Sequence, residues 1–210
     1  MCAHIVSLTG RERPRVCLLP TASGDRSDVT VSFYAALAPV ADASHIELHG
    51  VPPRDLRDRL LAADAICVTG GNTANLLAVW RVHGVDVVLR EAWERGAVLW
   101  GSSAGMLCWF ECGVTDSFGP ELDPLHDGLG WLPGSACPHY DGEERRRPVY
   151  TNLVAGGFPG GYAADDGAGL VFDGTRLDEV VAVRAGATAY RVEAGADGAV
   201  ETPLEARLLA

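Results

Sequence analysis

The sequence has few basic residues and no long apolar run. Its 210 residues include 17 Lys and Arg against 28 Asp and Glu, which gives a formal net charge of −11. Nucleic acids and anionic membrane surfaces bind clustered positive charge, so this balance argues against both as partners. No apolar stretch approaches the ~20 residues of a membrane-spanning helix, and the N-terminus lacks the basic-then-apolar pattern of a signal peptide. We therefore expect a cytoplasmic protein with a small-molecule or peptide partner.

The chain also lacks the cysteine patterns of disulfide scaffolds and metal sites. Six cysteines are present, but no Cys-x-x-Cys pair occurs. Cys17 and Cys67 lie in predicted strands, so we expect them to be buried, reduced thiols. Cys108 and Cys112 are spaced to share one face of a predicted helix, where core packing is a better interpretation than metal binding. We expect no metal and no other cofactor.

Internal repeats and low-complexity segments are absent as well. With 210 residues, of which 48% are apolar, the chain is long enough to bury a sizeable core. This length favours a single domain over residues 1–210.

Apolar runs alternate with helical patterns through the first half of the chain. Strands are predicted for residues 15–22, 46–49, 65–68 and 97–100, and helices for residues 27–38, 56–61, 74–82, 86–95 and 106–110. In the first of these helices, Val31, Tyr34, Ala35 and Ala38 define the predicted apolar face. Alternating strands and helices predict an α/β fold with a mainly parallel sheet.

The regular alternation ends after Gly113. Residues 165–167 form a predicted turn between two strands, and the turn residues at 173–174 and 195–198 predict hairpins. We therefore expect antiparallel strands toward the C-terminus.

The most informative stretch is Gly101-Ser102-Ser103-Ala104-Gly105, which directly follows a predicted strand. A nucleophile elbow turns sharply from a strand into a helix and needs small residues around its strained central residue. Gly101, Ala104 and Gly105 meet that demand, so Ser103 is the candidate nucleophile. A second glycine turn, Gly70-Gly71, follows another predicted strand. Because ligands gather at the carboxyl ends of parallel strands, both turns are expected to border one crevice.

A serine nucleophile needs a base, and the base needs a third group that fixes its tautomer. His139 is the best candidate base, because it follows an apolar stretch downstream of the elbow. His126, in a loop rich in Pro, Asp and Gly, is its rival. The carboxylate remains open among Asp166, Asp165 and Asp116.

Together these motifs resemble the peptidase E (aspartyl dipeptidase) family of serine peptidases. The resemblance rests on Gly70 to Thr73, Gly101 to Gly105, Pro138-His139 and Asp166-Gly167, and it spans most of the chain. It implies a three-layer α/β sandwich like that of class I glutamine amidotransferases, with a flavodoxin-like, mainly parallel central sheet. Those amidotransferases carry cysteine at the elbow, whereas this chain carries Ser103.

The resemblance also implies roles for individual residues. Ser103 matches the family's nucleophile, His139 its general base, and Asp166 the position where the family carries a glutamate. Asp116 lies near another acidic residue implicated in the family. The backbone N–H groups of Gly71 and Ala104 match the oxyanion hole.

The expected substrate is a short peptide, foremost a dipeptide with an N-terminal aspartate. Arg145 is the nearest match to the arginine that clamps the substrate's aspartate side chain, and Arg–carboxylate pairing suits that role. The alternatives are a cyanophycinase-like or other amide hydrolase and a non-catalytic ligand-binding protein. The chain is short at its N-terminus compared with the family pattern, so either its start is misassigned or its sheet lacks an edge strand. A missing strand would expose an apolar sheet edge, which favours dimerisation or instability. We expect a monomer or a homodimer.

Overall fold

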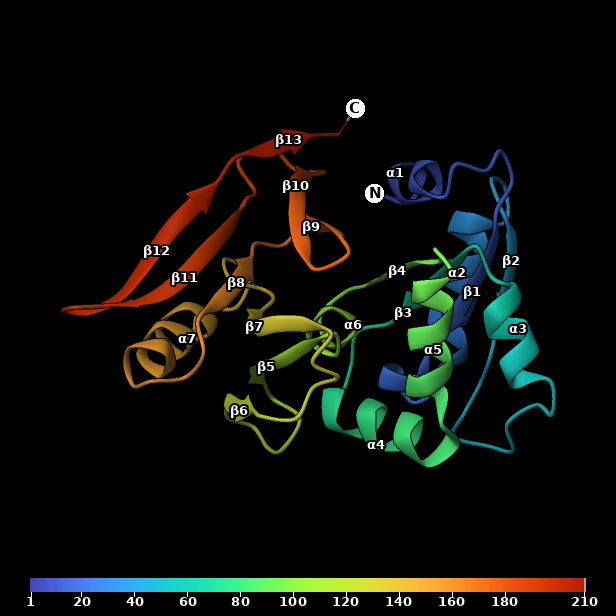
Figure 1. The fold of residues 1–210 in the computed structure, drawn as a ribbon, viewed down its shortest axis with the longest axis horizontal. Coiled ribbons are helices and arrows are strands. Elements are labelled where there is room, and N and C mark those ends of the chain that lie inside the picture. The colour runs from blue at the N-terminus through green and yellow to red at the C-terminus, as the bar shows by residue number, and fades with distance from the viewer. Residues whose placement is uncertain (210) are drawn as a thin grey trace. The chain divides into compact units, whose positions relative to one another are not determined.

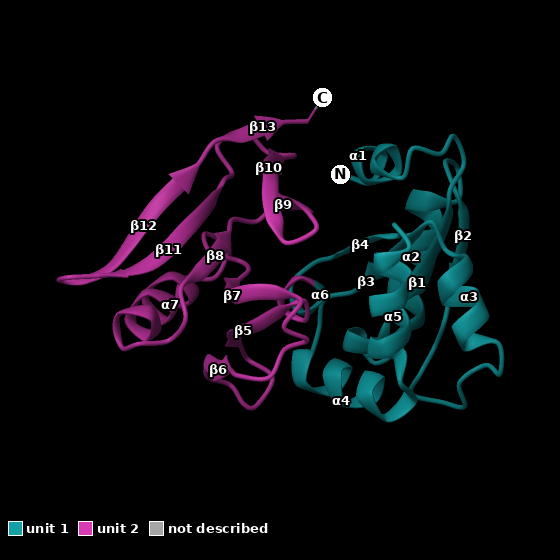
Figure 2. Cartoon of the chain, viewed as in Figure 1, with its two compact units in different colours: residues 1–105 teal, residues 106–210 magenta. Residues whose placement is uncertain are grey.

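The computed structural model describes residues 1–209, which divide into two compact units. The first unit is Met1–Gly105, and the second begins at Met106 (Figure 2). The first unit contains one sheet and the second unit contains two. The predicted single domain over residues 1–210 stays a prediction.

The first unit is built on a four-stranded parallel sheet (Figure 1). Its strands lie in the order β2 (Asp42–His45), β1 (Arg15–Leu19), β3 (Ala65–Val68) and β4 (Val98–Gly101). Every neighbouring pair is parallel. The apolar runs that predicted β1 and β3 are largely buried, as in strands covered on both faces. Because the strands are parallel, the loops that follow β1, β3 and β4 leave the same edge of the sheet.

Helices connect these strands. Asn72 caps the fourth helix by accepting a hydrogen bond from the Asn75 N–H at 2.8 Å, and Gly84 ends that helix in a left-handed conformation. No helix within residues 1–209 has the length and apolar character needed to cross a membrane. The helical elements are α1 (Cys2–Leu8), η1 (Thr21–Ser23), α2 (Ser27–Leu37), α3 (Leu56–Ala62), α4 (Thr73–His83) and α5 (Val85–Glu94), and α6 (Ala104–Leu107) begins at the end of the first unit.

The second unit contains a six-stranded mixed sheet and a three-stranded sheet. In the larger sheet, β7 pairs in parallel with β5 and β8, and the other pairs are antiparallel. Helix α7 (Arg146–Ala155) buries Tyr150 and Val154 in one cluster with Cys112 and Val192. The larger sheet has the order β12 (Gly198–Leu204), β11 (Ala189–Gly195), β8 (Gly161–Ala164), β7 (Leu132–Cys137), β5 (Phe110–Thr115), β6 (Asp123–Leu125), and the smaller sheet β13 (Ala206–Leu208), β10 (Arg176–Ala182), β9 (Ala168–Asp173).

The structure confirms the predicted α/β class, the parallel sheet and the antiparallel strands toward the C-terminus. Antiparallel β9 and β10 are joined through Gly174 and Thr175, directly after Asp173, and antiparallel β11 and β12 are joined within residues 195–198. Both hairpins lie where the turn residues predicted them.

Three predicted elements are wrong in part. The strand predicted for residues 15–22 is β1, which ends at Leu19, and the 3-10 helix η1 begins at Thr21. Residues 46–49 form no strand, and β2 lies at Asp42–His45 instead. The N–H groups of Leu48 and His49 donate to the Asp25 carboxylate at 2.6 and 2.7 Å, so they join no neighbouring strand. The helix predicted for residues 106–110 is α6, which ends at Leu107, and Phe110 begins β5.

The cysteine and helix-face predictions have mixed outcomes. All six cysteines are free, as expected, but Cys112 lies in β5, so it shares no helical face with Cys108. Helix α2 has the predicted extent with a different inner face. It buries Thr30, Phe33 and Leu37, whereas Val31 is 67% exposed.

Candidate active site

In the first unit, the two glycine turns meet at the carboxyl edge of the parallel sheet. β3 and β4 are neighbours, with Val68 opposite Gly101. Gly70 follows β3, and a Cβ placed on it would lie 3.3 Å from the Ser103 Cβ. The turn after β3 therefore contacts the turn that carries Ser103.

Ser103 has a left-handed backbone. Its φ angle is +55°, and within residues 1–209 the other non-glycine residues with positive φ are Asp25 and His139. This conformation costs a non-glycine residue roughly 1–2 kcal/mol, and such strain clusters at functional sites. A partly buried serine in this conformation between a strand and a helix has the local geometry of a nucleophile elbow.

The glycines on either side of Ser103 allow the elbow to pack against β3. A Cβ on Gly101 would lie 2.6 Å from both the Val68 and the Gly105 carbonyl oxygens. A Cβ on Gly105 would lie 2.4 Å from the Val68 oxygen. Both distances are far below van der Waals contact, so any larger residue at either position would force the turn away from the sheet.

The two amides predicted for the oxyanion hole belong to these contacting turns. Gly71 has φ +137° and passes so close to the loop after β1 that a Cβ on it would lie 2.0 Å from the Ala22 oxygen. The Asn72 N–H donates to the same oxygen at 2.8 Å, which fixes the turn. Ala104 is buried and is the first residue of α6, where N–H groups have no acceptor within the helix.

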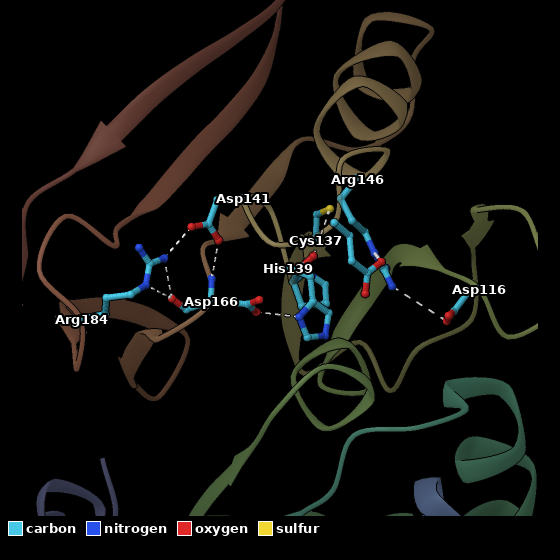
Figure 3. A network of polar contacts seen from close by, with 9 residues as sticks. Asp116, Cys137, His139, Asp141, Arg146, Asp166 and Arg184 are labelled. Carbon is cyan, nitrogen blue, oxygen red and sulfur yellow. Dashed lines mark hydrogen bonds and ion pairs between the residues drawn. The ribbon is translucent and has the colours of Figure 1, made fainter.

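In the second unit, His139 and Asp166 form a hydrogen-bonded pair (Figure 3). His139 Nδ1 lies 2.7 Å from Asp166 Oδ1. These residues follow the parallel neighbours β7 and β8, and the Tyr140 N–H donates to the Ala164 oxygen at 3.0 Å, which joins the two turns. A carboxylate on Nδ1 holds the neutral ring in the tautomer whose Nε2 accepts a proton. His139 also has a left-handed backbone, with φ +57°.

Two residues that sequence reasoning missed support Asp166. The Asp166 N–H donates to Asp141 Oδ1 at 2.7 Å, and Arg184 donates to the Asp166 carbonyl oxygen and to Asp141 Oδ2 (Figure 3). Burial alone would raise the pKa of Asp141, but the Asp166 N–H and the Arg184 guanidinium together hold that pKa below its usual value. The sequence carries a weak sign of Asp141, two residues after His139. It carries none of Arg184, which lies in the turn that follows β10.

The other candidate carboxylates have partners other than His139. Asp116 lies 3.9 Å from Arg146, whose side chain is only 3% exposed. Asp165 accepts a hydrogen bond from the Thr188 N–H at 3.0 Å, and burial raises its pKa. Among the three, only Asp166 is hydrogen-bonded to His139 within residues 1–209.

The remaining predicted residues have other contacts. Arg145 forms an ion pair with Glu121 and donates to the Pro120 oxygen at 2.8 Å. Its guanidinium is more than half exposed. The ring of His126 packs edge-on against Phe158, with ring centroids 5.6 Å apart. His139, by contrast, has the hydrogen bond to a carboxylate that orients a general base.

Comparisons with known proteins find consistent relatives. The sequence profile described as Peptidase family S51 matches residues 1–180. A Bacillus subtilis (strain 168) protein named "Uncharacterized peptidase YgaJ" is 48% identical over 208 residues, which cover 98% of this chain and 90% of that protein.

Two solved structures share the fold at low sequence identity. The structure of a peptidase from an acI-B1 Actinobacterium has a TM-score of 0.70 and 17% identity, and the match covers 98% of this chain and 88% of that one. A Listeria monocytogenes EGD-e protein, named provisionally as peptidase E, has a TM-score of 0.57 and 16% identity, with 98% and 94% covered.

Proposed function

Because the chain belongs to peptidase family S51, we propose that it is a serine peptidase that cleaves short peptides with Ser103 as its nucleophile. The observation that carries the proposal is the backbone strain. Of the non-glycine residues with left-handed backbone in residues 1–209, two are the serine and the histidine chosen from the sequence. A fold retains such strain where the surrounding structure fixes a side chain for chemistry.

In the proposed reaction, Ser103 Oγ attacks the carbonyl carbon of the scissile peptide bond as His139 Nε2 takes the hydroxyl proton. His139 then gives this proton to the leaving amine, and the acyl group remains as an ester on Ser103. A water molecule, deprotonated by the same nitrogen, hydrolyses the ester and restores the serine. The Asp166 carboxylate stabilises the imidazolium from Nδ1.

The amides of Gly71 and Ala104 are the proposed oxyanion donors. Both are backbone groups of tightly fixed turns, so they need no reorganisation when negative charge develops on the substrate oxygen. Loss of one such donor typically costs about 3 kcal/mol of transition-state stabilisation.

The proposed substrates are dipeptides with an N-terminal aspartate, whose side chain would pair with Arg145. A guanidinium can bind a carboxylate through two parallel hydrogen bonds. Since Arg145 is already paired with the exposed Glu121, substrate would have to replace that carboxylate. Exposed ion pairs contribute little energy, so the exchange is feasible.

The test compares Asp-Xaa and Ala-Xaa dipeptides by the rate of amine release. Wild-type protein should cleave Asp-Xaa faster, Ser103→Ala should abolish cleavage, and Arg145→Ala should raise KM for Asp-Xaa alone. Arg176→Ala is the matched control, because it removes another exposed, ion-paired arginine. Undiminished cleavage by Ser103→Ala would remove the nucleophile assignment. Cleavage of β-linked aspartyl-arginine in preference to both dipeptides would favour a cyanophycinase-like amide hydrolase.

A further inference from the structure

The turn that carries Asp166 is held by two side chains, those of Asp141 and Arg184, and neither is hydrogen-bonded to the His139 ring. Asp141 Oδ1 accepts the Asp166 N–H at 2.7 Å. The Arg184 guanidinium donates to the Asp166 carbonyl oxygen, from Nη2 at 2.9 Å and from Nε at 3.3 Å. The same guanidinium is ion-paired with Asp141 Oδ2. Both backbone polar groups of Asp166 are thus fixed by side chains (Figure 3).

The carboxylate of Asp166 has a further constraint at Gly142. A Cβ on Gly142 would lie 2.0 Å from Asp166 Oδ2 and 2.8 Å from its Cγ. Gly142 has no positive φ, so its backbone conformation does not require glycine. The reason for a small residue there is the space that the second carboxylate oxygen fills.

This support matters because the Asp166 side chain is itself exposed. Its relative exposure is 55%, against 29% for His139. An exposed side chain is not fixed by packing, so the orientation of its carboxylate depends on where the backbone is held. A misplacement of about 1 Å in a catalytic group can cost on the order of 10²-fold in rate.

We propose that Asp141 and Arg184 are positioning residues that fix the backbone of Asp166, and that Gly142 leaves the space its carboxylate needs to face His139 Nδ1. The proposal rests on the proposed function, since it assigns the support of the same catalytic histidine. It adds residues from the turn after β10 and from the turn after β7 that contact no substrate. Their effect on turnover passes through Asp166 alone.

The test is a double-mutant cycle on kcat for the best dipeptide. Asp141→Ala, Arg184→Ala and Gly142→Ala should each lower kcat on the order of 10- to 100-fold with little change in KM. In an Asp166→Ala background, each should cost less than about 2-fold, because residues that act through one group are not additive. A merely structural role would lower activity by the same factor in both backgrounds, and that result would overturn the proposal.

Conservative and control variants keep the test decisive if a variant folds poorly. Asp141→Asn keeps an oxygen that accepts the Asp166 N–H, and Arg184→Lys keeps one donor, so both should recover part of the lost kcat. Gly50→Ala controls for Gly142→Ala, because nothing lies within 4 Å of its added Cβ, and Asp178→Ala removes a comparable exposed carboxylate. Both controls should keep wild-type kcat.

A spectroscopic readout separates positioning from stability. The His139 Nδ1 proton, hydrogen-bonded to Asp166, should give a low-field proton resonance that Gly142→Ala shifts or broadens. An unchanged resonance together with unchanged kcat in Gly142→Ala would refute the role of this glycine. If wild-type protein cleaves no peptide, the proposed function fails. If it cleaves and the Asp141 and Arg184 variants match it, only the positioning proposal fails.

Discussion

The left-handed backbone of Ser103 predicts that glycine is more stabilising than alanine at position 103. At the neighbouring Ser102 we expect the opposite order. Ser103 has φ +55°, whereas the φ angle of Ser102 is not positive. Alanine at 103 keeps the left-handed strain, because a Cβ is still present, whereas glycine removes it. Ser102 has no left-handed strain to relieve, so glycine at this position only increases the backbone entropy lost on folding.

The size of the effect follows from these two terms. Relief of the left-handed strain stabilises Ser103→Gly by roughly 1–2 kcal/mol, and the entropy of glycine opposes it by about 0.5–1 kcal/mol. Ser103→Gly should therefore unfold with a free energy about 1 kcal/mol higher than Ser103→Ala, a shift of about 2–4 °C in Tm for a chain of this length. At Ser102 the glycine variant should be the less stable one, by about 0.5–1 kcal/mol.

Thermal and urea unfolding followed by circular dichroism measures all four variants. Both Ser103 variants should lose peptide cleavage, whereas Ser102→Ala and Ser102→Gly should retain the fold. A Ser103→Gly protein no more stable than Ser103→Ala would show that the elbow stores no strain. It would also remove the main structural reason for selecting Ser103.

Two further predictions concern titratable groups. Burial raises the pKa of Cys17 from 9.0 to about 11, so its thiolate fraction at pH 8 falls from about 10% to about 0.1%. Iodoacetamide at pH 8 should leave Cys17 unmodified by mass spectrometry and peptide cleavage unchanged; modification of Cys17 in the folded protein would contradict the prediction. Burial likewise raises the pKa of Asp165, so its contribution to stability is greatest below the ordinary value of 3.8 and is lost as pH rises through the raised value. Asp165→Asn keeps an acceptor for the Thr188 N–H but does not titrate. As pH rises through the raised pKa, the unfolding free energy of this variant should increase relative to that of wild type. Parallel curves of unfolding free energy against pH for the two proteins would contradict the raised pKa.

Apolar runs predicted the strands of the first sheet correctly where the buried residues also pair with a neighbouring strand. β1 and β3 are continuous apolar runs, and both form parallel strands. At residues 46–49 the same reasoning fails, because Ile46 and Leu48 are buried while two of the backbone N–H groups bond to Asp25. Alternation of apolar and polar residues predicts which side chains are buried. It does not predict which acceptor each backbone N–H bonds to.

Short apolar stretches leave the choice of helix or strand open. Residues 106–110 are apolar whichever structure they adopt, and the turn from α6 into β5 divides them. In α2, two overlapping sets of residues have helical spacing. In the structure Phe33 and Leu37 are buried and Tyr34 packs at the edge of the same cluster, and the sequence contains no sign of that choice.

In the candidate site, too, local features were predicted from the sequence and long-range contacts were not. Glycine spacing identified the elbow, because steric limits at Gly101 and Gly105 are local to the sequence. The partner of His139 stayed open among three aspartates until the pairing of β7 with β8 set Asp166 beside it. Arg184 joins this network from 18 residues further along the chain, and no local pattern predicts such a contact.

The most direct measurement is the reaction of the protein with a fluorophosphonate, followed by intact-mass and peptide mass spectrometry. Wild-type protein should take up one phosphonyl group per chain on Ser103, Ser103→Ala should take up none, and His139→Ala should react much more slowly. A stoichiometric adduct on any other residue, or no adduct on a folded protein that cleaves dipeptides, would contradict the assignment of Ser103 as the nucleophile.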